Sequence, residues 1–462
     1  MNELILLGAG ASVEAGIPGS HQMTQAIVEK FHQNPVHRQY VRVANFVIGG
    51  LLFQEGIRGH DPLDSGVNVE SFFNAVQLLA DRHTLEAAPF VGSWHSMVEE
   101  FDKVSPSFLK LDRLNEEFYK SVRDEILDAF SASPSSYEAG KIDKTLEKAI
   151  SKVVEAAVKN RSVSFSTSES IGRAVDTYIS QVVKQWTSKL KSSRPSSSSQ
   201  LEKEFQKAVS ESLAQPGQGR IFQQTAELMI RTLTEIVWVD SPDRVTYLNP
   251  ILDFARSRKR LVIATLNYDN AIELAAGSQR VQCDTGIDGW SQAGIIDTTG
   301  ECLHLLKLHG SIDWEWRRDV VTKERPLPHS TIHQVSATRL TEGGFRPAVI
   351  FGQRNKLTAE GPFLDLLRAF QQELVQATMF TVIGYSFGDD HVNTYISQWL
   401  NQSSEHRIRI VNPGFEKSMV PYVEHLKRLR EERPEQIQVL ADHASEGLLK
   451  LYGDLGRNES NV

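Results

Sequence analysis

Two hydrophobic patterns alternate along much of the chain. Segments with apolar residues at helical spacing occur at 361–376, 391–400 and 416–430. They are separated by short apolar runs of the length of buried strands, and buried strands that alternate with helices predict a parallel, doubly wound sheet. The runs with strand character lie at 4–7, 261–266, 303–308, 347–351, 379–383, 407–411 and 436–440.

The middle of the chain has a different pattern, with amphipathic helical spacing and few strand signals. We therefore expect a first sheet segment at 1–55, an all-helical insertion at 56–245 and the rest of the sheet domain at 246–462. A serine-rich stretch at 191–200 predicts a flexible connection inside the insertion. The helices are expected at 67–80, 108–130, 142–158, 171–190 and 221–239. The fold class is α/β, Rossmann-like, with a large helical insertion.

A glycine-rich turn, Gly8-Ala9-Gly10-Ala11-Ser12, follows the first strand and precedes a helical pattern. A strand, a glycine turn and a helix start form the plan of a phosphate-binding site, because the backbone and the helix amides can approach an anion. An ordinary glycine turn is the alternative. A dehydrogenase fingerprint would have Gly or Ala at Val13 and an acidic residue about 20 residues further on, so hydride transfer is disfavoured.

Composition narrows the class of protein. The 462-residue chain has a net charge of −8, which argues against general nucleic-acid binding. Two cysteines, Cys283 and Cys302, cannot make a disulfide framework or a four-thiolate zinc site, and a reducing cytoplasm is expected. The longest apolar stretch, 41–53, is too short to span a bilayer, and a strand at the N-terminus leaves no room for a signal peptide. We expect a cytoplasmic protein that binds neither membranes nor nucleic acid directly.

Polar residues follow four of the predicted strands. Because carboxyl ends of parallel strands meet at one edge, these groups should converge near Gly8. Each has a simpler alternative: the acidic and amide groups could cap helices, the histidine could belong to the core, and the last asparagine could form a turn before proline. The residues are Asn267, Asp269 and Asn270, then His309, then Gly384, Ser386, Asp389 and Asp390, and finally Asn412.

These motifs together resemble the sirtuin family, in the family's order, over 1–55 and 246–445. The segments that carry the resemblance are Gly8–Ser12 with Gly16-Ile17-Pro18, Thr265–Asp269, Leu308-His309-Gly310, Arg346–Gly352, Gly384-Tyr385-Ser386 and Asn412.

The resemblance implies NAD as the substrate and a role for each matching residue. The family's NAD-binding opening matches Gly16, Ile17 and Pro18, and Asp269 would receive the nicotinamide carboxamide. Asn267 would position the nicotinamide ribose or a water, and His309 would be the catalytic base. The diphosphate would be held by Gly8, Ala9, Gly10 and Ser12, and the phosphates and adenosine ribose by Gly384, Ser386 and Asn412.

Two departures from the family pattern are informative. No cysteine lies between His309 and Gly352, where protein-deacylating members carry two zinc-binding pairs, so we expect no zinc and no other metal. The family's aromatic residue and arginine after Gly-Ile-Pro are replaced by Ser20 and His21, which should open the reactive ribose carbon to water. This pattern resembles divergent bacterial sirtuin-like NAD hydrolases of antiphage defence systems.

From this resemblance we expect an enzyme that hydrolyses NAD to nicotinamide and ADP-ribose. Free hydrolysis would deplete the cell, so an inactive state is expected, with the helical insertion providing homo-oligomer or partner contacts. The resemblance suggests a hexameric DNA-translocating ATPase or an Argonaute-type module as the partner. Two other functions stay open: a protein deacylase or ADP-ribosyltransferase, and a non-catalytic sensor of NAD or ADP-ribose.

Overall fold

The structure is a computed structural model. It describes residues 2–34, 37–59, 66–85, 88, 95–103, 220–340, 345, 347–351 and 361–453. The helices predicted at 108–130, 142–158 and 171–190 and the connection at 191–200 lie outside these residues. The chain divides into two compact units: Met1–Val76 with Thr225–Thr341 and Phe345–Val462, and Gln77–Gln224 with Glu342–Gly344.

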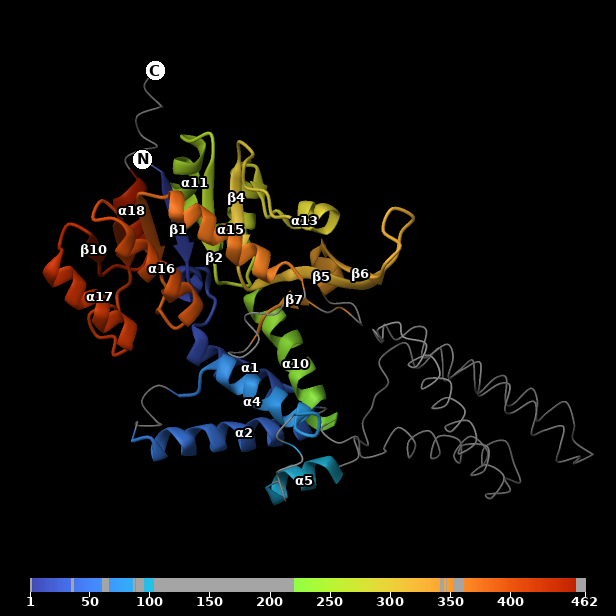
Figure 1. The fold of residues 1–462 in the computed structure, drawn as a ribbon. Helices are drawn as coiled ribbons and strands as arrows, with labels where there is room; N and C mark the ends of the chain where they lie inside the picture. The colour runs from blue at the N-terminus through green and yellow to red at the C-terminus, as the bar shows by residue number, and fades with distance from the viewer. Residues whose placement is uncertain are drawn as a thin grey trace, which may run out of the picture. The chain divides into compact units, whose positions relative to one another are not determined.

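The first unit is built on a seven-stranded sheet in which every neighbouring pair is parallel (Figure 1). Its central strands are buried along their whole length, which explains why they are continuous apolar runs in the sequence. The predicted α/β class with a doubly wound parallel sheet is confirmed. The strand order is β10 (Ile437–Leu440), β9 (Arg407–Val411), β8 (Met379–Ile383), β1 (Glu3–Leu7), β2 (Leu261–Thr265), β4 (Leu303–Lys307) and β3 (Cys283–Asp284).

Helices cover both faces of this sheet. α15 (Phe363–Gln376) and α16 (Asp390–Gln402) share a buried core with Leu4 and Leu6 of β1. Glu3 faces the other way and accepts a hydrogen bond from Tyr452 of α18 (Ala444–Tyr452), which contacts α11 (Asn249–Arg256). Other helices of the first unit are η1 (Ala9–Ala15), α1 (Ser20–Gln33), α2 (Arg38–Ile57), η4 (Pro242–Leu248), α12 (Ala271–Ser278), α13 (Ile287–Ala293), α14 (Ala337–Leu340) and α17 (Pro421–Glu432).

A smaller antiparallel sheet begins directly beyond β4. β5 (Gly310–Val320) pairs with β6 (His329–Gln334) on one side and with β7 (Pro347–Val349) on the other. The prediction that 347–351 joins the parallel sheet is therefore wrong. The chain turns at Gly310, which has φ of +82° and would place a Cβ only 2.0 Å from the Ala348 carbonyl oxygen, so only glycine fits this crossing.

The elements described between residues 56 and 245 are helical. α4 (Val69–Asp81) and α10 (Arg220–Val237) confirm two of the predicted helices, and α5 (Ser96–Lys103) lies between them in sequence. Within the second unit, Phe101 of α5 packs edge-on against Phe222. The borders proposed at 55/56 and 245/246 stay predictions. No helix among the described residues is both long and apolar enough to cross a membrane.

The strand order reverses at β1. The chain runs outward from β1 to β2 and β4 on one side, and later returns to β8 on the other side of β1 before continuing to β9 and β10. In doubly wound sheets, ligands bind outside the carboxyl ends of the strands at such a reversal. The residues that follow β1 and β8 therefore form the expected ligand-binding edge of this sheet.

Candidate functional site

The turns that follow β1 and β8 are in direct contact through glycines. Gly8 donates its backbone N–H to the Ile383 carbonyl at 2.9 Å, and Gly10 donates to the Gly384 carbonyl at 2.8 Å. A Cβ on Gly8 would lie 2.5 Å from Tyr385 Cα, and Gly384 has φ of +64°. These glycines are thus needed for the close approach of two turns. Contact of Gly8, exposed Ala9 and Gly10 with a diphosphate stays a prediction.

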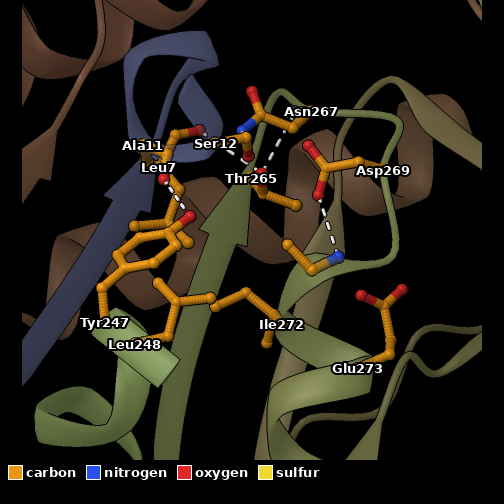
Figure 2. A pocket seen from close by; sticks show the side chains of 11 residues that line it. Leu7, Ala11, Ser12, Tyr247, Leu248, Thr265, Asn267, Asp269, Ile272 and Glu273 are labelled. Carbon is orange, nitrogen blue, oxygen red and sulfur yellow. Dashed lines mark hydrogen bonds between the residues drawn. The ribbon is translucent and has the colours of Figure 1, made fainter. Parts of the chain in front are cut away.

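Asn267 ties the end of β2 to the glycine turn. Its Nδ2 donates to the Gly8 carbonyl and to Ser12 Oγ, both at 2.9 Å. Its backbone N–H donates to Thr265 Oγ1 at 3.0 Å, and Figure 2 shows Asn267 with Ser12 and Thr265. Because the Gly8 carbonyl can only accept, the amide orientation is fixed and Oδ1 faces away from these partners. The structure thus brings Gly8, Ser12 and Asn267 together and leaves an amide oxygen that can accept from a hydroxyl or a water.

A small pocket lies beside this cluster, with about 260 Å³ of empty space (Figure 2). Most of this space is open to solvent, and the cavity itself is about 10 Å³, room for about one water molecule, so in this conformation it is too small for a nicotinamide ring. Tyr247 closes one side and donates its hydroxyl to the Ala11 carbonyl at 2.6 Å; burial raises the pKa of this phenol. The lining residues are Leu7, Ala11, Ser12, Tyr247, Leu248, Thr265, Asn267, Asp269, Ala271, Ile272 and Glu273.

Gly16, Ile17 and Pro18 line a second, wider pocket between the end of η1 and α1, with about 610 Å³ of empty space open to solvent. Gly16 ends η1 with φ of +81°. Arg244 holds this turn, since its Nε donates to the Ala15 carbonyl at 2.8 Å. The three predicted residues are therefore together, on a different pocket from Asn267.

Asp269 lies one residue before Asn270, the N-cap of α12. Its Oδ1 accepts from the N–H of Ala271, the first residue of the helix, at 3.0 Å, so this oxygen supports the start of α12 without being its N-cap. The adjacent Asn270 is used structurally: it exchanges two hydrogen bonds with the backbone of Val239, at 2.8 and 2.9 Å. Asp269 also lines the small pocket, and its second carboxylate oxygen is directed away from Ala271 (Figure 2).

Lys307 holds the loop that carries Asp269, and the sequence did not predict this role. It is fully buried at the end of β4 and donates to the Asp269 carbonyl at 2.5 Å and to Glu273 Oε1 at 2.6 Å. Burial lowers the Lys307 pKa. The carboxylates of Glu273, Asp313 and Asp269 raise it by more than burial lowers it, so its pKa is above that of a free lysine. Lys307 therefore stays an ammonium and fixes the backbone that presents Asp269.

His309 pairs with Asp389 at the end of β4. Its Nε2 lies 3.1 Å from Asp389 Oδ2, and the two residues are 6% and 5% exposed. Asp389 is also the N-cap of α16, because its Oδ1 accepts from the backbone N–H groups of His391 and Val392. An ionised carboxylate only accepts, so Nε2 carries a proton, and in the neutral ring Nδ1 keeps a lone pair. The sequence placed Asp389 correctly but did not predict its pairing with His309, which is 80 residues away.

Tyr385 connects the two halves of the site. Its hydroxyl accepts from the Asp389 N–H at 2.9 Å, and its backbone carbonyl accepts from Asn412 Nδ2 at 3.1 Å. Burial, with Asp389 adding to it, holds its pKa well above the ordinary value, so the phenol stays neutral. Through Gly8 and Tyr385 the Asn267 cluster reaches the His309 pair, although Asn267 and His309 share no hydrogen bond in the described chain. The side chain of Ser386 is exposed.

Aromatic rings flank His309. The Tyr268 ring centroid is 6.2 Å from that of His309, and Phe351 packs edge-on to Tyr268 at 5.7 Å. Phe73 packs on Phe351 at 4.7 Å. Burial raises the Tyr268 pKa, and its hydroxyl donates to the Ile350 carbonyl at 2.9 Å. The imidazole is thus packed against Tyr268 on one side and held by Asp389 at Nε2.

Comparison with known proteins gives one family. Residues 261–431 match the model of a family described as a SIR2-like domain. This stretch, from β2 to α17, is more than a third of the chain and includes Asn267, Asp269, His309, Asp389 and Asn412. No curated protein matches the chain.

Two solved structures are similar at low identity. One is a mutant Sir2 homologue in complex with 2′-O-acetyl-ADP-ribose, at 17% identity and a TM-score of 0.31. The other is a mutant Sir2 homologue in complex with ADP-ribose, at 15% identity and a TM-score of 0.30. Each alignment covers 53% of this chain and 79% of the other. The fold assignment therefore depends on the sheet order described above.

Proposed function

We propose that this chain hydrolyses NAD, cleaving the bond between nicotinamide and ribose to release nicotinamide and ADP-ribose. The observation that carries the proposal is that the His309–Asp389 pair and the Asn267–Gly8–Ser12 cluster both lie at the carboxyl ends of the parallel strands, the edge at which such sheets bind ligands. The match of residues 261–431 to a SIR2-like domain supports the same substrate.

The proposed chemistry uses each group for one task. Cleavage of an N-glycosidic bond builds positive charge on the ribose, which the Asn267 amide oxygen would stabilise. Nicotinamide leaves as a neutral molecule with the bonding electron pair, and the oxygen of water bonds to the ribose carbon. His309 Nδ1 would take the proton from that water, while Asp389 holds the ring through Nε2.

Binding roles in the proposal follow the same geometry. Asp269 would accept from the nicotinamide carboxamide, and its loop is held for this by Lys307. The diphosphate and adenosine would be bound by the two touching turns and by the open pocket at 16–18. The residues concerned are Gly8, Ala9, Gly10, Ser12, Gly16, Ile17, Pro18, Gly384, Ser386 and Asn412.

Mass spectrometry of a reaction with NAD tests the proposal. The full chain, alone and with acyl-lysine peptide, should give free ADP-ribose and nicotinamide in equal amounts whether or not peptide is present. His309→Ala and Asn267→Ala should each lower the rate by about 10²–10⁴-fold. His391→Ala, at an exposed histidine of α16, is the matched control and should keep the rate.

Other products would assign another function. O-acyl-ADP-ribose that forms only with peptide would mean a deacylase, and labelled protein would mean an ADP-ribosyltransferase. Intact NAD that nevertheless co-purifies with the chain would mean a sensor. Turnover retained in both variants would contradict the roles of Asn267 and His309.

The proposal extends to the cellular setting. We infer a cytoplasmic, NAD-depleting effector of antiphage defence, assembled as a homo-oligomer and controlled by a hexameric DNA-translocating ATPase or an Argonaute-type module. Expression of the wild-type chain with its partner should lower cellular NAD, and the His309→Ala variant should not. If the cellular NAD level is unchanged although the purified enzyme is active, the proposed role in NAD depletion is wrong and the proposed hydrolysis still stands.

A further inference from the structure

Three metal-binding side chains meet at the end of β4 opposite to His309. β3 and β4 are parallel, and Asp284 is the register partner of His304, so these two side chains lie side by side on one face. Cys302 precedes His304 by two residues and faces the same way. Their donor atoms all lie within 4.8 Å of one another, and this is the one such group of three within the described chain.

The ring of His304 is oriented like that of a metal ligand. Its Nε2 lies 2.8 Å from the Gly300 carbonyl, which can only accept, so Nε2 carries the proton. In the neutral ring Nδ1 then holds a lone pair; Nδ1 lies 3.8 Å from Asp284 Oδ2 and 3.9 Å from Cys302 Sγ, and this sulfur is 3.6 Å from Nε2. A metal-bound histidine usually donates its second N–H to a carbonyl in this way. The His304 side chain is only 3% exposed, so bulk water does not satisfy this lone pair.

We propose that Asp284, Cys302 and His304 bind one divalent transition-metal ion of the zinc class. Nitrogen, thiolate and carboxylate donors suit Zn²⁺ and Co²⁺ and are not the oxygen-only set that Mg²⁺ or Ca²⁺ prefers. Tetrahedral Zn²⁺ with ordinary bond lengths sets its sulfur and nitrogen ligands about 3.5 Å apart, close to the 3.9 Å between Cys302 Sγ and His304 Nδ1. Asp284 is half exposed, and water can complete the coordination.

The ion would have a structural role. It would join β3, a two-residue strand at the edge of the sheet, to β4 and to the loop that precedes it. Five residue steps separate His304 from His309, about 16 Å along an extended chain, so the ion would not touch the proposed substrate. The sequence excluded a four-thiolate site; it could not show that one thiol meets a histidine and a carboxylate.

Cobalt binding to the full-length chain tests the proposal. The metal-stripped protein, reduced to keep both thiols, is titrated with Co²⁺ and should bind one equivalent. A thiolate-to-cobalt absorption band should appear in the near ultraviolet, and one equivalent of Zn²⁺ should remove it. Zn²⁺ should also raise the melting temperature of the stripped protein.

Matched variants identify the ligands. Cys302→Ser should abolish the near-ultraviolet band, and Asp284→Asn, at a half-exposed position, should weaken Co²⁺ binding at least tenfold. Cys283→Ser is the control, since Cys283 pairs with Leu303 on the opposite face and should keep both band and affinity. Absence of saturable binding, a band that survives Cys302→Ser, or a band lost in Cys283→Ser would each overturn the proposal. None of these measurements depends on NAD turnover.

Discussion

Asp389 shows how one side chain serves both the fold and the proposed chemistry. One of its oxygens caps α16 and the other meets His309. A carboxylate that already accepts two backbone hydrogen bonds is held in place, so the second oxygen is a rigid partner for the imidazole. The orientation of His309 is therefore fixed by the start of a helix that follows a different strand.

Replacing Asp389 by Asn separates these two tasks. Asn is as good an N-cap as Asp, so the folded state should lose little stability. The amide can donate as well as accept, which permits the wrong tautomer of His309, and the rate of nicotinamide release should fall about 10²–10⁴-fold. Release of nicotinamide is followed by chromatography, with circular dichroism melting to verify folding.

The neighbouring residue offers the control for this change. Asp390→Asn alters an exposed carboxylate in the first turn of the same helix and should leave the rate within about twofold. An unchanged rate in Asp389→Asn would mean that the pair with His309 is only structural. A large loss of melting temperature in that variant would contradict the argument about the cap.

At the scale of elements, the sequence predicted the parallel sheet well because buried parallel strands are apolar without interruption. β1, β2, β4, β8 and β9 occur within a residue of their expected bounds. The antiparallel sheet was missed, although Ile312, Trp314 and Trp316 alternate with polar residues in the manner of a half-buried strand. The direction in which β7 pairs depends on the turn at Gly310, and a short apolar run does not encode it.

The same limit applies to the site. Residues next to strand ends could be predicted, because topology alone places Asn267, His309 and Asn412 at one edge. Pairings between distant segments could not, and these include Asp389 with His309 and Lys307 with Glu273. Lys307 interrupts the apolar run at 303–308 as the last residue of β4, and a lysine in such a run was the available signal for an internal ion pair.

Lys307→Met should destabilise the fold strongly. Removing one partner leaves the Glu273 carboxylate, whose side chain is only 16% exposed, without its cation, and the loss of one partner of a buried pair typically costs about 3–5 kcal/mol in the free energy of unfolding. Burial already raises the Glu273 pKa and Lys307 opposes this, so the pKa rises further in the variant. When the folded-state pKa of a carboxyl is raised, the protonated form is the one that the fold favours. The fold is therefore more stable at low pH, and it loses this stability as the pH rises through the raised pKa and the carboxyl ionises. The deficit relative to wild type should shrink from pH 8 toward pH 5, as measured by urea unfolding.

A second substitution tests whether the broken Lys307–Glu273 ion pair causes the loss of stability. Lys307→Met combined with Glu273→Gln removes both charges and should recover at least half of the lost stability, with little dependence on pH. If the double variant is as unstable as the single one, packing rather than charge accounts for the loss. A deficit that grows toward pH 5 would contradict the sign of the argument.

At the scale of the whole molecule, every residue proposed to bind NAD lies in the first of the two compact units. A ligand stabilises the part of a protein that it binds, by about 2.7 kcal/mol when its concentration is 100 times Kd. Scanning calorimetry of His309→Ala, which should bind NAD without consuming it, is therefore expected to show two transitions. NAD should raise one of them by a few degrees and leave the other unchanged.

The calorimetric result depends on which unit holds the ligand, so a variant of the first unit can assign the shifted transition. Asn267→Ala in the His309→Ala background removes a contact to the glycine turn and should reduce the shift at the same NAD concentration. Nicotinamide alone, which lacks the diphosphate, should produce almost no shift in either case. A shift confined to the transition that Asn267→Ala does not affect would place the binding site in the second unit. It would contradict the proposal that NAD binds at the ends of β1, β2 and β8.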